Sequence, residues 1–326
     1  MRLGILSAAA IAPAAVVDPA KVVDGVEITA IAARDPERAK AFAVEHGIPN
    51  VVTSYEALCT SDLVDAIYIA TPAALHLRWT LAALAGGKHV LCEKPLAANA
   101  VEARVMVDAG HAAGLVMMEA LHWRYHPMAQ RIREICDTEL GTLERAEASF
   151  DVGHIPPTDI RHVLSLGGGA LMDLGVYPLQ WVRWVAQAEP TVVSAEATVG
   201  PPEVDLAIDA ELTFPHGLSA RIRSSMVPGV PFAAQLRVTG SAGTLVVMNP
   251  LNPAMGNSIE VTTESGTRRE EAPRTPTYTY QMQAFLAAVE EGTPYPTGGA
   301  DSIGTMLAVD AIYRAAGLSP RPSLTW

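Results

Sequence analysis

Cysteine is scarce in this sequence and its few copies are far apart. Only three of the 326 residues are cysteines: Cys59, Cys92 and Cys136. They form no CxxC pair and no cysteine–histidine cluster with ligand spacing, so a structural zinc ion is disfavoured and no metal site is predicted. A low, odd number of cysteines is typical of proteins in a reducing compartment, and we expect a cytoplasmic protein.

Long apolar runs and excess positive charge are also lacking. No apolar run reaches the roughly 20 residues that a membrane span needs. The net charge of −12 argues against nucleic acid or an anionic membrane as a partner. The small, apolar stretch between Arg2 and Val17 could be read as a signal peptide. We favour the alternative, because Leu3–Leu6 is needed as the first strand of the pattern that follows.

Short apolar runs alternate with helical patterns over residues 1–120. The segment 36–46 shows the helical type clearly, with Asp35 as its expected N-cap and Gly47 just past its end. Strands joined by helices of this length predict right-handed βαβ crossovers and a doubly wound parallel sheet. The expected strands are Leu3–Leu6, Val26–Ala33, Ala66–Ala70, His89–Cys92 and Val116–Glu119, and the expected helices are Ile11–Val17, Pro36–His46, Tyr55–Cys59, His76–Ala85 and Ala98–Ala113.

The pattern changes after about residue 121 to runs of strands. Apolar Ala210, Leu212 and Phe214 alternate with Glu211 and Thr213, which predicts a sheet with one covered and one polar face. The expected strands are Thr142–Phe150, Val192–Val199, Ala207–Phe214, Leu218–Ser225, Ala234–Thr239 and Thr244–Met248, and the expected helices are Met128–Cys136, Leu171–Ala186, Tyr280–Glu291 and Ser302–Ala315.

Two domains follow from these patterns. Residues 1–121 are expected to form a Rossmann domain of the α/β class. Residues 122–326 are expected to form an α+β domain on a large, open, mostly antiparallel sheet, whose last helices could pack back on the first domain. The predicted helices are too few to cover both sheet faces, so we expect the bare face to join subunits in a homodimer or homotetramer.

The turn after the first strand departs from the dinucleotide-binding fingerprint. Ser7, Ala9 and Ala12 stand where GxGxxG has its glycines. Small side chains still permit close backbone approach to a pyrophosphate, and the helix beginning near Ile11 offers free amides. These four residues are therefore candidate cofactor ligands, with an ordinary βα turn as an equal alternative. Loss of the first glycine predicts that the turn avoids positive φ there.

The second predicted strand ends at Arg34, where NAD-specific folds carry an acidic residue. A guanidinium group suits the 2′-phosphate of NADP, so we expect NADP and keep NAD as the alternative cofactor. Two other interpretations stay open. Arg34 could be a solvated residue at a strand end, and Asp35 could still bond a ribose hydroxyl.

Two further segments carry groups that could do chemistry. The fourth predicted strand ends in Glu93, Lys94 and Pro95, and strand ends of this kind face the ligand crevice. Lys94 could donate to a substrate oxygen there, or belong to a surface Glu–Lys pair. Asp173 and Tyr177 are four residues apart and would share one helix face. Taken alone, they fit better as a cap and a core aromatic residue.

Together these segments resemble the glucose–fructose oxidoreductase/inositol dehydrogenase (Gfo/Idh/MocA) family over nearly the whole chain. The order and spacing of two motifs, EKP at residues 93–95 and DxGxYP at residues 173–178, are highly specific. The run GGGALMDLGVYP and the serine of the first turn look most like dimeric dihydrodiol dehydrogenases and their bacterial sugar-dehydrogenase relatives. The matching segments are AARDPERA (32–39), ATPAALH (70–76), GKHVLCEKP (87–95), EALHWRYHP (119–127), GGGALMDLGVYP (167–178) and GSAGTL (240–245).

The resemblance implies an NAD(P)-dependent oxidoreductase that acts on CH–OH groups of a small sugar, polyol or diol. Lys94 would contact the reacting hydroxyl and the nicotinamide ribose. Tyr177 would be the general acid/base, a position that many relatives fill with histidine. Asp173 would bind substrate or orient Tyr177, and Arg34 would meet the 2′-phosphate. The remaining candidates are Thr71, Pro72, His76 and Glu93 for the cofactor, Trp123 and Arg124 for the substrate, and Tyr125, His154, Arg161 and His162 as further pocket residues.

Lys94 and Tyr177 make chemical sense as a pair. A free tyrosine has a pKa of about 10, which is too high for an efficient base near neutral pH. A neighbouring ammonium group would stabilise the phenolate by its charge. One rival hypothesis is a non-catalytic, cofactor- or sugar-sensing regulator on the same scaffold, which would need neither residue. Another is a methyltransferase, which the EKP segment and the sheet-rich second half disfavour.

Overall fold

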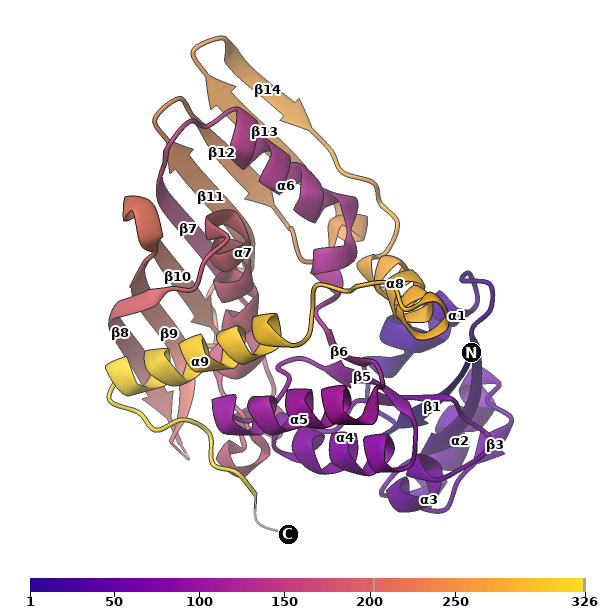
Figure 1. Ribbon diagram of the computed structural model, residues 1–326. Helices are drawn as coiled ribbons and strands as arrows, with labels where there is room; N and C mark the ends of the chain where they lie inside the picture. The colour runs from indigo at the N-terminus through magenta and orange to yellow at the C-terminus, as the bar shows by residue number, and fades with distance from the viewer. Residues whose placement is uncertain (202, 325–326) are drawn as a thin grey trace. The chain divides into compact units, whose positions relative to one another are not determined.

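A computed structural model describes residues 1–201 and 203–324, which divide into two compact units (Figure 1). The first unit contains residues 1–125, residues 278–303 and the segment from Ser323. The second contains residues 126–277 and 304–322. No helix in the described ranges is long and apolar enough to cross a membrane.

The first unit is built on a six-stranded parallel sheet with the order β3-β2-β1-β4-β5-β6. Its central strands are almost wholly buried, as expected for a parallel sheet covered on both faces. This confirms the predicted Rossmann sheet. The strands are β1 (Arg2–Leu6), β2 (Glu27–Ala32), β3 (Asn50–Val51), β4 (Ala66–Ile69), β5 (His89–Glu93) and β6 (Met117–Ala120).

Local signals set the helices of the first unit. The carboxylate of Asp35 accepts hydrogen bonds from the Glu37 and Arg38 amides, and α2 ends at Gly47 with φ of +70°, as predicted. Residues of α8 join the core of this unit from far along the chain. The helices are α1 (Asp18–Ala20), α2 (Pro36–His46), α3 (Tyr55–Cys59), α4 (His76–Ala85), α5 (Ala100–Ala113) and α8 (Thr277–Glu291), with a π-helical turn at Pro13–Val17 and 3-10 turns at Ala73–Leu75 and His122–Tyr125.

The second unit is built on an eight-stranded sheet with the order β14-β13-β12-β11-β7-β10-β9-β8. Every neighbouring pair is antiparallel except β7 and β10, which run parallel. The strands are β7 (Leu143–Asp151), β8 (Thr191–Gly200), β9 (Val204–Thr213), β10 (Ser219–Ser225), β11 (Ala233–Gly240), β12 (Gly243–Met248), β13 (Ser258–Thr263) and β14 (Gly266–Glu270).

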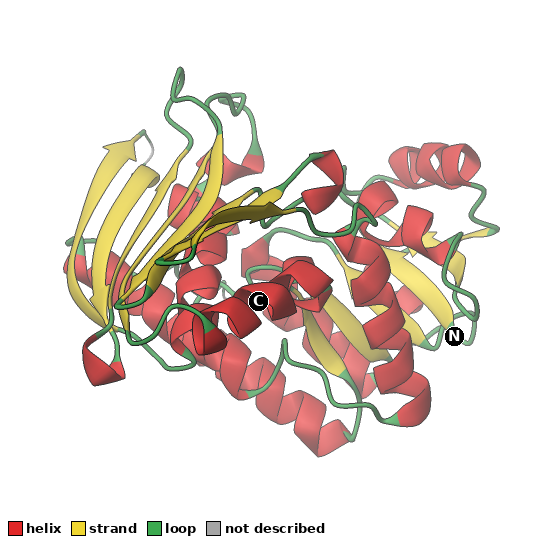
Figure 2. Ribbon diagram, turned by 90° about the horizontal axis from the view of Figure 1, so that it is seen from above, coloured by secondary structure: helices red, strands yellow, loops and turns green. Residues whose placement is uncertain are grey.

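Helices cover one face of this sheet (Figure 2), and α7 packs against β7, β10 and β11. Ala146 and Ala148 of β7 are buried while Glu147 between them is exposed, which is the predicted alternation. The helices are α6 (Pro127–Thr138), α7 (Val176–Ala186) and α9 (Ala300–Ala315), of which residues 304–315 belong to this unit. A π-helical turn lies at Leu171–Gly175, and 3-10 turns lie at Ile160–His162, Leu164–Leu166, Pro215–Gly217 and Pro253–Met255.

The prediction for the first turn is wrong. Ser7 has φ of +97°, although the missing glycine predicted that the turn avoids positive φ. The amide of Ser7 donates to the carbonyl of Ala32 at 2.9 Å, so the turn stays paired with the end of β2. Tertiary pairing therefore sets this conformation, and a serine in it carries strain of roughly 1–3 kcal/mol.

The cap of α5 yields a stability prediction. Oδ1 of Asn99 accepts from the amides of Val101 and Glu102, both at 3.1 Å, and Nδ2 donates to Ser323 at 3.1 Å. Asn99→Ala should lower the free energy of unfolding by about 0.5–2 kcal/mol, because it leaves helix amides without their acceptor. Asn99→Asp keeps the cap and loses the amide group that donates to Ser323, so it should cost less. Urea unfolding of both variants measures this, and equal losses would contradict the capping role.

Candidate active site

The predicted cofactor residues stand at the carboxyl ends of neighbouring parallel strands. Ser7 follows β1, Arg34 lies just beyond β2, Thr71 lies just beyond β4, and Lys94 follows β5. Because β1 pairs with both β2 and β4, and β4 pairs with β5, these ends share one edge of the sheet. The strand order reverses between β1 and β4, and open α/β sheets bind their ligands outside such a point.

Two guanidinium groups are exposed near the end of β2. Arg34 belongs to the exposed turn, and Arg38 lies in the first turn of α2. Nη2 of Arg38 donates to the carbonyl of Ala8 at 2.8 Å, which ties it to the first turn. The carboxylate of Asp35 is engaged as the cap of α2. Our sequence analysis missed Arg38, although its place one helical turn after Arg34 was a usable signal.

Glu93 braces the loop that carries Lys94. Its buried carboxylate accepts from the hydroxyl of Tyr68 at 2.7 Å and from the amide of Lys94 at 3.2 Å. Burial raises the pKa of Tyr68 well above its usual value, so its hydroxyl remains a proton donor. Glu93 was predicted as a cofactor ligand, and the structure shows these two contacts with its own loop and with β4.

Two more buried side chains hold the same loop. The ring of His76 lies between backbone carbonyls, with Nε2 at 2.8 Å from Thr71 O and Nδ1 at 3.0 Å from Pro95 O. Oε1 of Glu119, which is 1% exposed, accepts from the amide of Leu96 at 2.9 Å. Sequence reasoning missed Glu119, whose only signal was a lone carboxylate in the apolar run of β6.

Two predicted substrate residues are packed within the first unit. Trp123 is 1% exposed, and the guanidinium carbon of Arg124 lies 5.7 Å from its ring centroid. Nη1 of Arg124 lies 3.9 Å from the carboxylate of Asp301. The hydroxyl of Tyr125 is 2.5 Å from that of Thr297. Their contacts with substrate stay a prediction.

Asp173 and Tyr177 share one helical stretch of the second unit, as predicted. Asp173 lies in the π-helical turn that runs directly into α7, and such turns are frequent at functional sites. Tyr177 is 4% exposed, and its ring meets that of Phe150 edge to face at 5.7 Å. This packing holds the tyrosine ring in one orientation. Lys94 belongs to the first unit, and its pairing with Tyr177 stays a prediction from the sequence.

The carboxylate of Asp173 pairs with Arg161. Nε of Arg161 donates to it at 2.5 Å, and Nη1 bonds both oxygens of Asp159 at 3.1 Å. Burial lowers the pKa of Arg161, but the two carboxylates outweigh this and raise it overall, so the guanidinium stays charged. His162 contacts a carbonyl of its own loop at 3.4 Å, and His154 is exposed. Within the described residues, no group of three or more His, Cys, Asp or Glu side chains could hold a metal ion.

Known protein families match both halves of the chain. Residues 7–121 match the oxidoreductase family with an NAD-binding Rossmann fold, and residues 128–246 match the GFO/IDH/MocA C-terminal domain. An NADP-dependent D-xylose 1-dehydrogenase from Haloferax volcanii is 35% identical over 295 residues, which cover 89% of this chain and 90% of that protein. The trans-1,2-dihydrobenzene-1,2-diol dehydrogenase of Mus musculus is 36% identical over 222 residues, which cover 67% of this chain and 65% of that one.

A solved structure matches over almost the full length. A 3-ketoreductase from Actinomadura kijaniata, in complex with NADP and TDP-benzene, has a TM-score of 0.91 at 29% identity and covers 97% of both chains. Further structures of that enzyme carry a tyrosine replaced by phenylalanine, or a lysine replaced by alanine or glutamate. On the family matches and the full-length relatives, this chain belongs to the Gfo/Idh/MocA family of oxidoreductases.

Proposed function

We propose that the protein is an NADP-dependent dehydrogenase or reductase acting on a hydroxyl-bearing or carbonyl carbon of a sugar, polyol or diol. The observation that carries this proposal is the shared edge of the first sheet. There Ser7, Arg34 and Lys94 follow β1, β2 and β5, on both sides of the point at which the strand order reverses. The names of the relatives support the substrate class, because a xylose dehydrogenase, a dihydrodiol dehydrogenase and a 3-ketoreductase all act on such carbons.

The groups near the end of β2 fit NADP better than NAD. Arg34 and Arg38 are exposed cations, whereas the carboxylate of Asp35 is occupied by the amides of α2. Arg34 and Arg38 would hold the 2′-phosphate, since guanidinium groups bind phosphate by paired hydrogen bonds. The small residues of the first turn let the backbone approach the pyrophosphate closely.

The chemistry needs a proton carrier and a positive donor beside the reacting carbon. A nicotinamide cofactor held at this edge of the sheet would supply the hydride in reduction and accept it in oxidation. As the family resemblance implies, Lys94 would donate to the substrate oxygen and would stabilise the Tyr177 phenolate by its charge. Tyr177 takes the hydroxyl proton during oxidation and returns it during reduction, and Asp173, held by Arg161, orients Tyr177 or binds substrate. A sensing protein would need neither Lys94 nor Tyr177, so their presence favours the enzyme.

Cytoplasmic residence is part of the proposal. Cys59, Cys92 and Cys136 are all buried and form no disulfide. Burial raises the pKa of Cys59 to about 11 and that of Cys136 to about 12, so these thiols stay protonated and unreactive. Unpaired, inert thiols are typical of proteins in a reducing compartment.

The cofactor assignment predicts a selective effect of Arg34. Arg34→Ala should raise the KM for NADP roughly 10- to 100-fold and leave the KM for NAD nearly unchanged, because it removes a charge-assisted bond that only the 2′-phosphate can make. Arg38→Ala should act in the same direction. Arg104→Ala, on the exposed side of α5, is the matched control. Steady-state kinetics with both cofactors measures these KM values. Equal effects of Arg34→Ala on the KM for NADP and for NAD would contradict the assignment of Arg34 to the 2′-phosphate.

The proton-transfer role predicts the behaviour of Tyr177→Phe. Turnover should fall about 10²- to 10⁴-fold while NADPH binding is retained, since general acid–base catalysis contributes this much. Lys94→Ala should be at least as damaging, and the double variant should lose less than the product of the two effects. Single-turnover rates and NADPH fluorescence titration measure both quantities.

A control separates chemistry from packing. Tyr295→Phe removes a hydroxyl that bonds the backbone of Met117, and should reduce stability by about 1 kcal/mol without loss of turnover. If Tyr177→Phe behaves in the same way, Tyr177 is a core residue only. The candidates for the proton-transfer role would then be the histidines His154 and His162.

We also propose a homodimer or homotetramer that forms through the open face of the eight-stranded sheet. Ion pairs cross this face between strands: Arg145 bonds Glu211 at 2.7 Å, and Arg221 bonds Asp209 at 2.5 Å. Arg221 is half exposed. Positive and negative side chains therefore lie side by side on this face, so the same face of a second copy could present complementary charges to it.

Light scattering tests the assembly. At micromolar concentration the particle should weigh about 69 kDa or a multiple of it, given a chain mass of 34.4 kDa. Arg221→Glu should shift the particle toward the monomer by placing like charges together, whereas Arg104→Glu in the first unit should not. A single particle of about 34 kDa for the unaltered protein would refute the proposal.

A further inference from the structure

A buried ion pair lies beneath the glycine run that leads to Asp173 and Tyr177. Arg321 and Asp205 are 3% and 0% exposed, and the guanidinium group of Arg321 donates to the carboxylate of Asp205. The hydroxyl of Tyr313 also donates to this carboxylate, at 3.1 Å. The guanidinium carbon of Arg321 lies 4.1 Å from the centroid of the Tyr313 ring.

This cluster holds the backbone on both sides of Gly169. Nε of Arg321 donates to the carbonyl of Gly168 at 2.7 Å. Oδ2 of Asp205 accepts from the amide of Leu171 at 2.8 Å, and Leu171 is the first residue of the π-helical turn that contains Asp173. Ala170, which precedes this turn, makes no side-chain cap. The carboxylate of Asp205 from β9 therefore fills the role of a helix cap.

Glycine is required where the loop crosses the cluster. Gly169 has φ of +137°, and a Cβ at this position would overlap the carboxylate of Asp205 and the guanidinium of Arg321. A Cβ at Gly168 would collide with the carbonyl oxygen of Arg161, the residue that pairs with Asp173. The glycine run is therefore clamped between the cluster and the Arg161 segment.

A bulge in β9 turns Asp205 toward this loop. In the pairing of β8 with β9, Thr198 lies opposite Ala207 and Val199 opposite Asp205, so Leu206 is an extra residue. One extra residue reverses which face the next side chain occupies. Asp205 is thus buried, although the alternation of β9 would place it with Asp209 on the polar face.

Stability alone does not explain a charge pair at this depth. Replacing a buried ion pair by apolar residues is often neutral or stabilising, because both charges lose their hydration. Burial raises the pKa of Asp205 even with Arg321 beside it. What the pair provides instead is geometry, since each partner fixes one backbone group of the same loop.

We propose that Asp205, Arg321 and Tyr313 form a positioning cluster that sets the place of Asp173 and Tyr177 by holding Gly168 and Leu171. This inference rests on the proposed role of Tyr177. The cluster does not touch substrate in this proposal. It acts through the π-helical turn, where the amide of Asp173 donates to the carbonyl of Gly169 at 3.1 Å.

The test separates geometry from charge burial. Arg321→Met leaves the Asp205 charge buried without its partner and should lower both the Tm and kcat. The double variant Arg321→Met/Asp205→Asn removes both charges and should recover most of the Tm. Its kcat should nevertheless stay about 10- to 100-fold low with an unchanged KM for NADP, because a small misplacement of a reacting group is costly. Arg321→Lys keeps the charge and should partly restore kcat.

A readout that is independent of activity accompanies the kinetics. Hydrogen–deuterium exchange of the peptide spanning residues 167–178 should speed up in Arg321→Met and in the double variant. Tyr313→Phe loses the hydroxyl but keeps the ion pair of Arg321 with Asp205, so it should give a smaller effect of the same kind. This milder variant keeps the test decisive where Arg321→Met fails to fold.

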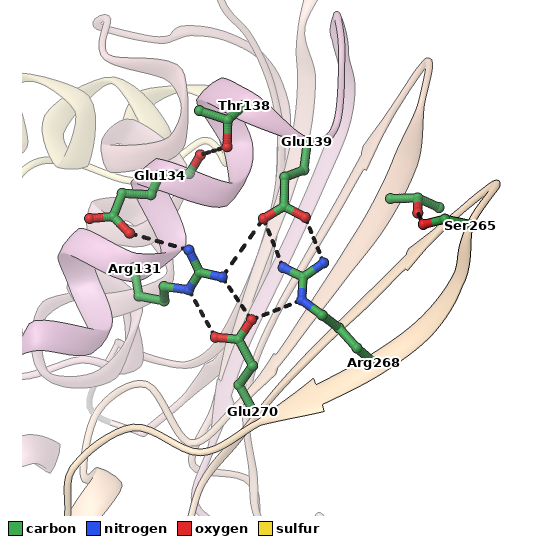
Figure 3. A network of polar contacts seen from close by, with 8 residues as sticks. Arg131, Glu134, Thr138, Glu139, Ser265, Arg268 and Glu270 are labelled. Carbon is green, nitrogen blue, oxygen red and sulfur yellow. Dashed lines mark hydrogen bonds and ion pairs between the residues drawn. The ribbon is translucent and has the colours of Figure 1, made fainter.

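The matched control is the ion-pair network between α6 and β14 in the same unit (Figure 3). There Arg131 bonds Glu270 at 2.7 Å, and Arg268 bonds Glu139 at 2.6 Å. Five strands of the sheet separate β14 from β9, so this network is remote from the cluster. Arg131→Met should lower the Tm without changing kcat or exchange at residues 167–178.

Wild-type kcat and unchanged exchange in the double variant would overturn the inference. If those results coincide with an inactive Tyr177→Phe, the positioning cluster fails while the proposed function stands. If Tyr177→Phe is fully active, the proposed role of Tyr177 fails, and faster exchange at residues 167–178 would still show that the cluster holds the loop.

Discussion

Parallel strand pairing in the first sheet is the constraint on which the candidate site depends. Strands that run in the same direction end at the same edge, so residues far apart in sequence, such as Ser7, Arg34 and Lys94, come to one place without any local signal that joins them. The turns that carry them have little regular structure of their own. Buried side chains such as His76 and Glu119 hold these turns by their backbone groups.

In the second unit, too, a buried side chain from a distant strand holds the segment that carries the proposed reacting residues. Asp173 and Tyr177 stand at the start of a helix whose first amide is satisfied by Asp205, a residue from another strand. In both units a buried carboxylate, Glu119 or Asp205, accepts from one backbone amide of a loop that carries a proposed reacting group. Each buried carboxylate costs hydration, and each fixes a loop that local sequence alone leaves free.

Much of the fold could be predicted because its signals are local. The helix from Pro36 to His46 follows from Asp35 before it and Gly47 after it, and the central strands are continuous apolar runs. β14 could not be found in this way. Its sequence GTRRE is largely exposed, and pairing with β13 rather than an apolar pattern makes it a strand. The conformation of Ser7 was mispredicted for the same reason, since its bond to Ala32 imposes it.

Residues of the candidate site could be predicted only where they lie within a recognisable sequence motif. Lys94 and Tyr177 lie inside recognisable segments, whereas Asp205 lies in a strand whose alternation assigns it to the polar face with Asp209. The extra residue Leu206 breaks that alternation and buries Asp205. A bulge leaves no compositional mark, because it is defined by what the neighbouring strand pairs with. The groups that set the geometry of a site are therefore hardest to read from sequence when one inserted residue decides which face they occupy.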